Sequence, residues 1–239
     1  VGIGIPGTMS PATGLVKNAN STCLIGHPLD KDLEMAIGCP VRLANDANCF
    51  VVSEAFDGAG ADARVVFGII LGTGVGGGIA IGGQPLIGIN SIAGEWGHSP
   101  LPWPTDTERP GAQCYCGRRG CIETFLSGPG LVRDYAEHGG GGSSSPSEIA
   151  TLADAGDRPA ICALERYEDR LARALATTIN LLDPDIIVLG GGLSNLGRLY
   201  EAVPKQWHRW VFSDQVTTPL VAARFGDSSG VRGAARLWP

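Results

Sequence analysis

Three cysteines crowd into eight residues of the chain, and a histidine precedes the first of them by sixteen residues. Three thiolates and one imidazole form a closed, tetrahedral structural zinc site. Such a site leaves no position for water, so the metal would hold the loop in shape and take no part in chemistry. The spacing therefore predicts a structural zinc site, with buried free thiols as the alternative. Its ligands would be His98, Cys114, Cys116 and Cys121.

A carboxylate stands in the motif Leu-Ala-Asn-Asp-Ala-Asn, where a short predicted strand (41–43) runs into a predicted helix (49–56). The Asp46 carboxylate could take a proton from a hydroxyl group, and the neighbouring Asn45 amide could bind a polyol. Asp and Asn also cap helix N-termini. The motif alone leaves both interpretations open.

Two further acids flank the cysteine-rich segment. Glu95 stands in Gly-Glu-Trp-Gly-His, and Glu123 follows the last of the three cysteines. If His98 binds a metal through one ring nitrogen, its other nitrogen is free to meet a hydroxyl group. The same loop would bring Glu95 and Glu123 near it, and carboxylates accept hydrogen bonds from sugar hydroxyls. The alternative is that both acids are solvated at the surface.

Glycine runs follow two apolar segments that read as buried strands. Gly72-Thr73-Gly74 opens a longer glycine run after residues 65–71, and Gly190-Gly191-Gly192 follows residues 185–189. Bare backbone amides suit phosphate oxygens, and ligands of open α/β sheets bind beyond the carboxyl ends of strands. The first run lacks the Gly-Lys-Ser/Thr ending of a Walker A loop. Its alternative is a tight β-turn.

The elements that would position these groups alternate between strand and helix. Helical composition marks residues 28–37, and apolar residues recur at three- and four-residue steps over 161–182. A closing helix is expected at 230–237. Strands alternating with helices predict an α/β architecture.

Composition narrows the class of protein further. The chain has 239 residues, 36 of them glycine, and a net charge of -6. This acidic balance argues against a nucleic-acid partner, which needs clustered Lys and Arg. No apolar run reaches the roughly 18 residues of a membrane span. The seven cysteines, an odd number, and the absence of a signal peptide favour a reducing, cytoplasmic compartment.

Taken together, these motifs resemble those of the ROK family of sugar kinases (repressor, open reading frame, kinase). The resemblance covers essentially the whole chain, through IGIPG, LANDAN, GTGVGGG, GEWGH, CYCGRRGC, IETFLSGPG and VLGGGLSN. It implies an actin/hexokinase-like (ribonuclease H-like) fold with a small domain (1–62 plus 227–239) and a larger one (63–226). The family's first phosphate loop, Asp-x-Gly-Gly-Thr, is missing from this sequence. We expect it in a segment before Val1, without which Mg-ATP is not bound productively.

The resemblance also implies a role for each motif. Asp46 would be the general base, and ATP would bind with Mg²⁺. The family is commonly dimeric, so a homodimer is expected. The sugar ring would be held by Asn45, Glu95, His98 and Glu123, the ATP phosphates by Gly72, Thr73 and Gly74, the adenosine by Gly190, Gly191 and Gly192, and zinc by His98, Cys114, Cys116 and Cys121.

Within the family, KNANST, EWGHSPLPW and DSSGVRGAA most resemble bacterial fructokinases that also accept mannose. The resemblance thus implies phosphorylation of fructose or mannose at the 6-position. The alternatives are an N-acetylglucosamine kinase or a glucokinase. Two alternatives belong to other functional classes. One is a sugar-sensing repressor, which is disfavoured because no basic helical segment is present. The other is a non-catalytic fragment stabilised by zinc.

Overall fold

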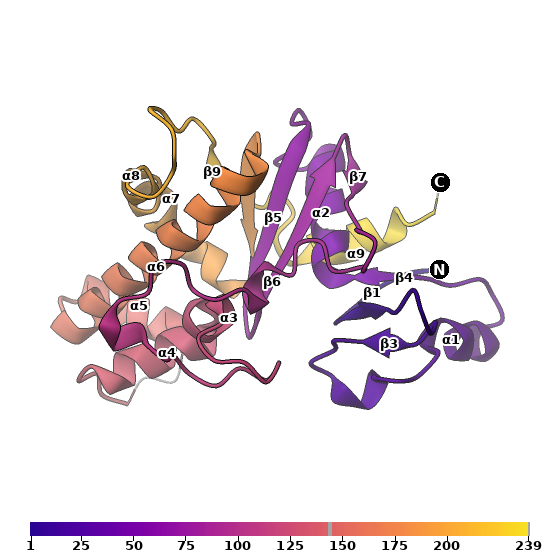
Figure 1. Cartoon of the computed structure of the whole chain (residues 1–239), viewed down its shortest axis with the longest axis horizontal. Helices are drawn as coiled ribbons and strands as arrows, with labels where there is room; N and C mark the ends of the chain where they lie inside the picture. The colour runs from indigo at the N-terminus through magenta and orange to yellow at the C-terminus, as the bar shows by residue number, and fades with distance from the viewer. Residues whose placement is uncertain (143–144, 239) are drawn as a thin grey trace.

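The computed structural model describes residues 1–142 and 145–238 and divides them between two sheet-based regions (Figure 1). The larger region contains a five-stranded sheet, and the smaller one contains a parallel pair and an antiparallel pair of short strands. In spatial order, the larger sheet consists of β7 (Gln84–Pro85), β6 (Val75–Ile81), β5 (Val65–Leu71), β8 (Ile186–Gly190) and β9 (Leu220–Ala222). The smaller pairs are β1 (Gly2–Ile5) with β4 (Arg42–Asn45) and β2 (Thr8–Met9) with β3 (Val16–Lys17).

The glycine run after β5 forms both a turn and a strand. Strand β6 pairs antiparallel with β5 from Val75 onward, so only residues 72–74 form the turn. The later glycines of the run lie within the strand, where bare backbone lets other segments approach closely. A Cβ at Gly78 would lie 2.5 Å from the carbonyl oxygen of Ala47, and one at Gly77 would lie 2.6 Å from that of Gly94.

The long helix α6 (Arg158–Leu182) forms the centre of the main core, as its apolar periodicity predicted. Asp157 caps its start by accepting a hydrogen bond from the Ala160 N–H at 2.9 Å, and Asp183 ends it in the left-handed conformation. Around it lie α3 (Ile122–Leu126), α4 (Gly128–Glu137), α5 (Pro146–Asp154), α7 (Leu199–Ala202) and α8 (Pro204–Trp207).

Helix α2 (Asp46–Asp57) connects the two regions. Its residues Phe50, Val51 and Ala55 pack in one buried cluster with Val66 of β5 and Val188 of β8. The helix also packs against α9 (Ser229–Ala235), which contacts β1. The N-terminus of α2 is thereby fixed beside both sheets (Figure 1).

The buried Glu54 carboxylate fixes α2 to the segment that leads into α9. It accepts hydrogen bonds from the backbone N–H groups of Ala59 (2.8 Å) and Arg224 (3.0 Å) and from the Ser229 hydroxyl (2.6 Å). The remaining elements are α1 (Leu29–Ile37) and short 3-10 turns at Thr22–Leu24, Trp96–His98, Asp106–Glu108, Gly192–Asn195 and Gly226–Ser228. Within the described part of the chain, no helix is both long and apolar enough to cross a bilayer.

Candidate active site

A cavity of about 250 Å³ lies where the start of α2, the β5–β6 turn and the cysteine loop meet. It brings together side chains and turns that are far apart in the sequence. Its lining includes eight of the predicted site residues, namely Asn45, Asp46, Gly72, Thr73, Gly74, Glu95, His98 and Glu123. It also includes residues to which the sequence analysis gave no role in the site, among them Pro6, Gly7, Asn18, Asn20 and Tyr115.

The two polar residues at the start of α2, Asn45 and Asp46, have different environments. Asn45 is the N-cap: its Oδ1 accepts hydrogen bonds from the N–H groups of Ala47 (3.0 Å) and Asn48 (3.4 Å). Its Nδ2 donates to the Gly7 carbonyl at 3.1 Å. The capping interpretation thus applies to Asn45, whose amide mainly fixes backbone. Burial raises the pKa of Asp46, and the Ala47 N–H partly opposes this shift.

Glu123 joins the cysteine loop to the glycine turn. Its Oε2 accepts a hydrogen bond from the Val75 N–H at 3.0 Å. A Cβ at Gly74 would lie 2.7 Å from the same oxygen, so a side chain there would displace the carboxylate. Glu123 therefore contacts the glycine turn directly, which the sequence analysis did not predict.

The Glu95 carboxylate faces the same cavity with no hydrogen-bond partner among residues 1–142 and 145–238. Burial raises its pKa, and the imidazole of His98 opposes the rise. The carboxylates of Asp46 and Glu123 raise it further, which indicates that the three acids share one small volume. A polyol could satisfy such carboxylates with its hydroxyl hydrogens.

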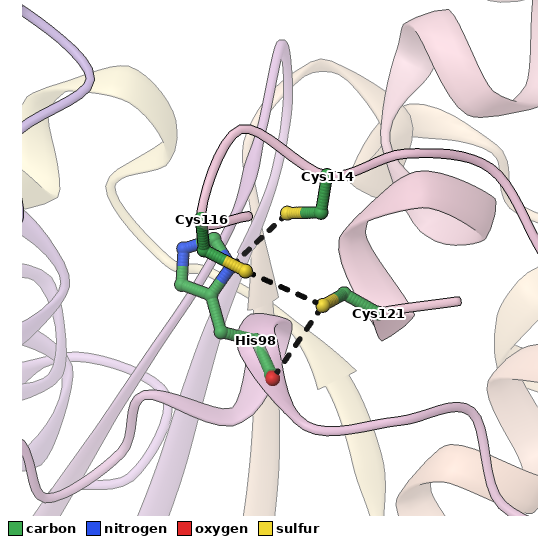
Figure 2. Close-up of side chains that lie close together, drawn as sticks. All are labelled: His98, Cys114, Cys116 and Cys121. Atoms are coloured by element: carbon green, nitrogen blue, oxygen red, sulfur yellow. Dashed lines mark hydrogen bonds between the residues drawn. The ribbon is translucent and has the colours of Figure 1, made fainter. Parts of the chain in front are cut away.

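The cysteine loop gathers its thiols around one imidazole nitrogen (Figure 2). Four ligand atoms, one from each residue, lie within 4.8 Å of one another. His98 Nδ1 is 3.5 Å from Cys114 Sγ, and the sulfurs of Cys116 and Cys121 are 3.6 Å apart. A tetrahedral zinc ion with bonds of about 2.0–2.3 Å spaces its ligand atoms about 3.3–3.8 Å apart, so these two distances match zinc and the group of four suggests a metal site.

Tyr115 holds the imidazole nitrogen that faces away from the thiols. Its Oη lies 2.9 Å from His98 Nε2, and the two rings are perpendicular. This nitrogen meets the Tyr115 hydroxyl here, and its predicted contact with a sugar hydroxyl stays a prediction. The sequence analysis missed Tyr115, although its position between two predicted metal ligands was a signal. Burial, followed by the Glu123 and Glu95 carboxylates, raises its pKa to about 12.

A second cavity of about 680 Å³ adjoins the first at Gly72 and Thr73. Its other walls come mainly from the start of α4 and from α5, and it also includes Gly192. Gly190 and Gly191 line neither cavity and instead allow close packing. A Cβ at Gly190 would lie 2.5 Å from the Phe50 ring, and one at Gly191 would lie 2.5 Å from the Leu71 carbonyl oxygen.

Comparisons with known proteins agree with this arrangement. The chain matches the ROK family model over residues 1–239. It is 40% identical over 241 residues to an N-acetyl-D-glucosamine kinase of Aliivibrio salmonicida, covering 99% of this chain and 80% of the relative. Its identity to an N-acetyl-D-glucosamine kinase of Pectobacterium atrosepticum is 41%, covering 99% and 79%.

Among solved structures, the chain resembles a ROK family glucokinase from Streptomyces griseus in complex with glucose and AMPPNP. The TM-score is 0.83 at 31% identity, covering 99% of this chain and 80% of that one. These relatives do not support the fructokinase-type preference that three motifs suggested. The family model spans the chain from end to end, and the fold is the actin/hexokinase-like α/β fold that the motifs implied, so this protein belongs to the ROK family.

Proposed function

We propose that this protein transfers the terminal phosphoryl group of ATP to a hydroxyl of a hexose, with N-acetylglucosamine as the preferred sugar. The observation that carries the proposal is the first cavity, where three carboxylates and an imidazole meet the glycine turn. The turn also borders the second cavity, so a sugar and a nucleotide can meet there. The names of the relatives support N-acetylglucosamine over fructose or mannose.

Phosphoryl transfer asks the protein mainly for in-line placement, charge neutralisation and exclusion of water. The sugar lies between the smaller region, with predicted bounds 1–62 and 227–239, and the larger one. Asp46 accepts the proton of the reacting hydroxyl. Glu95 and Glu123 accept hydrogen bonds from other hydroxyls, and Asn45 keeps the start of α2 in place.

The nucleotide lies across the glycine turn. The backbone N–H groups of Thr73 and Gly74 and the Thr73 hydroxyl face the phosphates, whereas the Gly72 N–H donates to the Gly74 carbonyl at 3.0 Å and shapes the turn. The adenosine occupies the larger cavity beside Gly192. Mg²⁺ bound with ATP supplies charge neutralisation. Gly190 and Gly191 contribute through packing, because their missing side chains allow β8 to end close to Phe50 and Leu71.

The role proposed for zinc is structural. His98, Cys114, Cys116 and Cys121 would hold it, and the donor set matches a closed site. With the loop held in this way, Glu123 at the start of α3 stays on the Val75 N–H, and the His98 ring stays beside the cavity.

The test is ADP release by the full-length protein with N-acetylglucosamine, glucose, fructose and mannose as separate substrates. We expect kcat/KM for N-acetylglucosamine to exceed that for fructose by at least about tenfold, the size of discrimination that one pocket contact supplies. An equal or higher value for fructose would restore the fructokinase prediction. Absence of ADP release with every hexose would contradict the kinase proposal itself.

A further inference from the structure

A third cavity of about 300 Å³ lies between α4 and the segment that leads from the Asp106–Glu108 turn into the cysteine loop. The α4 residues on its wall recur at three- and four-residue steps and so share one face of the helix, namely Gly130, Arg133, Asp134 and Glu137. Of these four residues, only Arg133 also lines the second cavity. Helix α4 therefore separates the third cavity from the proposed nucleotide cavity.

The wall of the third cavity carries guanidinium groups from three separate segments. Arg109 and Arg119 belong to the segment before α3, Arg133 belongs to α4, and Arg170 belongs to α6. These groups keep their charge at any physiological pH, and their N–H groups bind anions in pairs. Four of them around one cavity contrast with the net charge of -6 of the whole chain.

Two acidic side chains on the same wall are already neutralised by arginines. Glu108 accepts hydrogen bonds from Arg170 Nε and Arg173 Nη2, each at 2.7 Å. Asp134 accepts hydrogen bonds from Arg170 Nη1 and Arg166 Nη2, also at 2.7 Å. Arg166 and Arg173 do not line the cavity, so they compensate these carboxylates from outside it. The two acids therefore leave the cavity with a positive character.

Arg170 offers the cavity a donor that the chain itself does not use. Its side chain is 7% exposed, and its Nε and Nη1 are taken by the two carboxylates. Its Nη2 donates to no described residue and remains accessible to solvent. An almost buried guanidinium with a free Nη2 on a cavity wall calls for an acceptor from outside the chain.

Two further arginines are free to turn toward such an acceptor. Arg109 contacts the fully exposed Asp106 at 3.4 Å, and Arg119 donates to the Gln113 side-chain oxygen at 3.5 Å. Exposed contacts of this kind contribute little, so either guanidinium can exchange its partner for an anion at small cost. Arg133 is fixed more firmly, because it donates to the Thr124 carbonyl.

We propose that the third cavity binds a small anion that carries a phosphate group. Arg170 Nη2, Arg109, Arg119 and Arg133 would donate to its oxygens. Donors from three segments suit the tetrahedral oxygens of phosphate, whereas one guanidinium fork already satisfies a planar carboxylate. Inorganic phosphate and a sugar phosphate share this group. The site is distinct from the glycine turn, because Gly72 and Thr73 line only the other two cavities.

The experiment is calorimetric titration of the full-length protein with inorganic phosphate. Saturating AMPPNP and N-acetylglucosamine keep the first two cavities filled. We expect one phosphate to bind per chain, and to bind at least about tenfold more weakly to the double variant Arg109→Gln/Arg119→Gln, which loses charged hydrogen bonds. Arg133 is left unchanged because it also lines the second cavity. The control is the exposed Arg209→Gln, outside all three cavities, and zinc content should be equal throughout.

A parallel titration with N-acetylglucosamine 6-phosphate distinguishes the two sources of the phosphate group. Tighter binding of the ester than of inorganic phosphate, lost in the double variant, would identify a sugar phosphate as the ligand. Equal binding of both would identify the phosphate group alone. Absence of phosphate binding to the wild-type complex would overturn the site, and so would equal affinity in the double variant.

A second measurement needs no substitution and covers a double variant that loses its zinc. Phosphate should slow the modification of Arg109 and Arg119 by phenylglyoxal in the wild-type protein and leave that of Arg209 unchanged, as followed by mass spectrometry. Equal modification rates with and without phosphate would overturn the site. A protein that binds neither AMPPNP nor N-acetylglucosamine would refute the proposed function, while protection of Arg119 would still test this inference.

Discussion

The Glu123 carboxylate accepts a hydrogen bond from the Val75 backbone N–H at 3.0 Å. One residue belongs to the helix that follows the cysteine loop, and the other opens the strand after the glycine turn. Gly74 lies so close that a Cβ there would displace the Glu123 carboxylate. A side chain proposed to bind the sugar therefore also shapes the backbone proposed to bind phosphate.

This double role predicts different outcomes for two substitutions at one position. In Glu123→Gln the amide oxygen still accepts from the Val75 N–H, so affinity for AMPPNP stays near the wild-type value while sugar affinity falls. Glu123→Ala removes both contacts and weakens both ligands. Titration calorimetry with each ligand separates the two effects. Equal AMPPNP affinity in the Ala and Gln variants would show that the turn does not depend on Glu123.

Asp46→Asn should separate turnover from binding. The amide cannot accept a proton from the reacting hydroxyl, so kcat should fall about 10²- to 10⁴-fold. The sugar Kd should change little, because the amide keeps the size and polarity of the side chain. The exposed Asp32→Asn in α1 is the matched control. A kcat within about tenfold of the wild-type value would exclude a general-base role of the usual size.

The pH dependence of kcat should reflect the protonation of Asp46. Burial raises its pKa above the ordinary 3.8, so the carboxylate becomes protonated at a higher pH than an exposed aspartate does. Only the ionised form accepts a proton, and kcat should therefore fall on the acid side with a midpoint above that value. A kcat that stays constant down to pH 3.8 would contradict this assignment.

Zinc removal should loosen the sugar site more than the rest of the fold. We expect stoichiometric zinc by mass spectrometry and, after chelation, weaker sugar binding, because His98 and Glu123 lose their fixed loop. The Cys121→Ser variant should lose the metal. The Cys23→Ser variant should retain it, because Cys23 is exposed and is not one of the four proposed ligands. Full sugar affinity in the metal-free protein would refute the structural role.

Glu108 should dominate the acid sensitivity of the larger region. Burial opposes its ionisation, but hydrogen bonds from Arg173 and Arg170 lower its pKa to about 2 from the ordinary 4.5. A carboxyl group whose pKa is lowered by folding stabilises the folded state at pH values above its pKa in the unfolded chain. This contribution disappears as the pH falls from 4.5 toward 2. The difference in unfolding free energy between wild type and Glu108→Gln should therefore shrink across that range.

At neutral pH, Glu108→Gln removes one of the two carboxylate partners of each buried guanidinium, leaving Arg170 on Asp134 and Arg173 on Asp169. The loss of unfolding free energy should therefore lie below the about 3–5 kcal/mol of a fully broken buried pair and above the value of an exposed one. The control is Glu137→Gln, whose 3.9 Å contact with Arg133 is exposed and should cost at most about 1 kcal/mol. Chemical denaturation of the three proteins measures both values. A similar loss in both variants would mean that the buried pair adds nothing beyond a surface contact.

The elements with strong local signals could be predicted from the sequence. The apolar run of β5 and the repeating apolar face of α6 are properties of neighbouring residues. The early start of β6 could not be predicted in this way. Its glycines read as a loop, and they form a strand because β5 pairs with them and Ala47 approaches closely.

The candidate site shows the same division. The motifs indicated Asp46, Glu95 and Glu123, and the cavity brings all three together. They could not indicate which of two adjacent polar residues caps α2, because that depends on backbone geometry at Asn45. Nor could they place Tyr115, because the direction of an exposed side chain depends on a partner seventeen residues away in the sequence.

The close approach of Gly78 to Ala47 and of Gly77 to Gly94 has a consequence for how this protein can evolve. At these points two backbone segments are in direct contact. A single added methyl group would push Asp46, at the start of α2, away from the segment that bears Glu95. Side chains around the cavity can be exchanged to suit a new sugar while these backbone contacts keep their spacing. Selection for altered specificity should therefore leave Gly77 and Gly78 untouched.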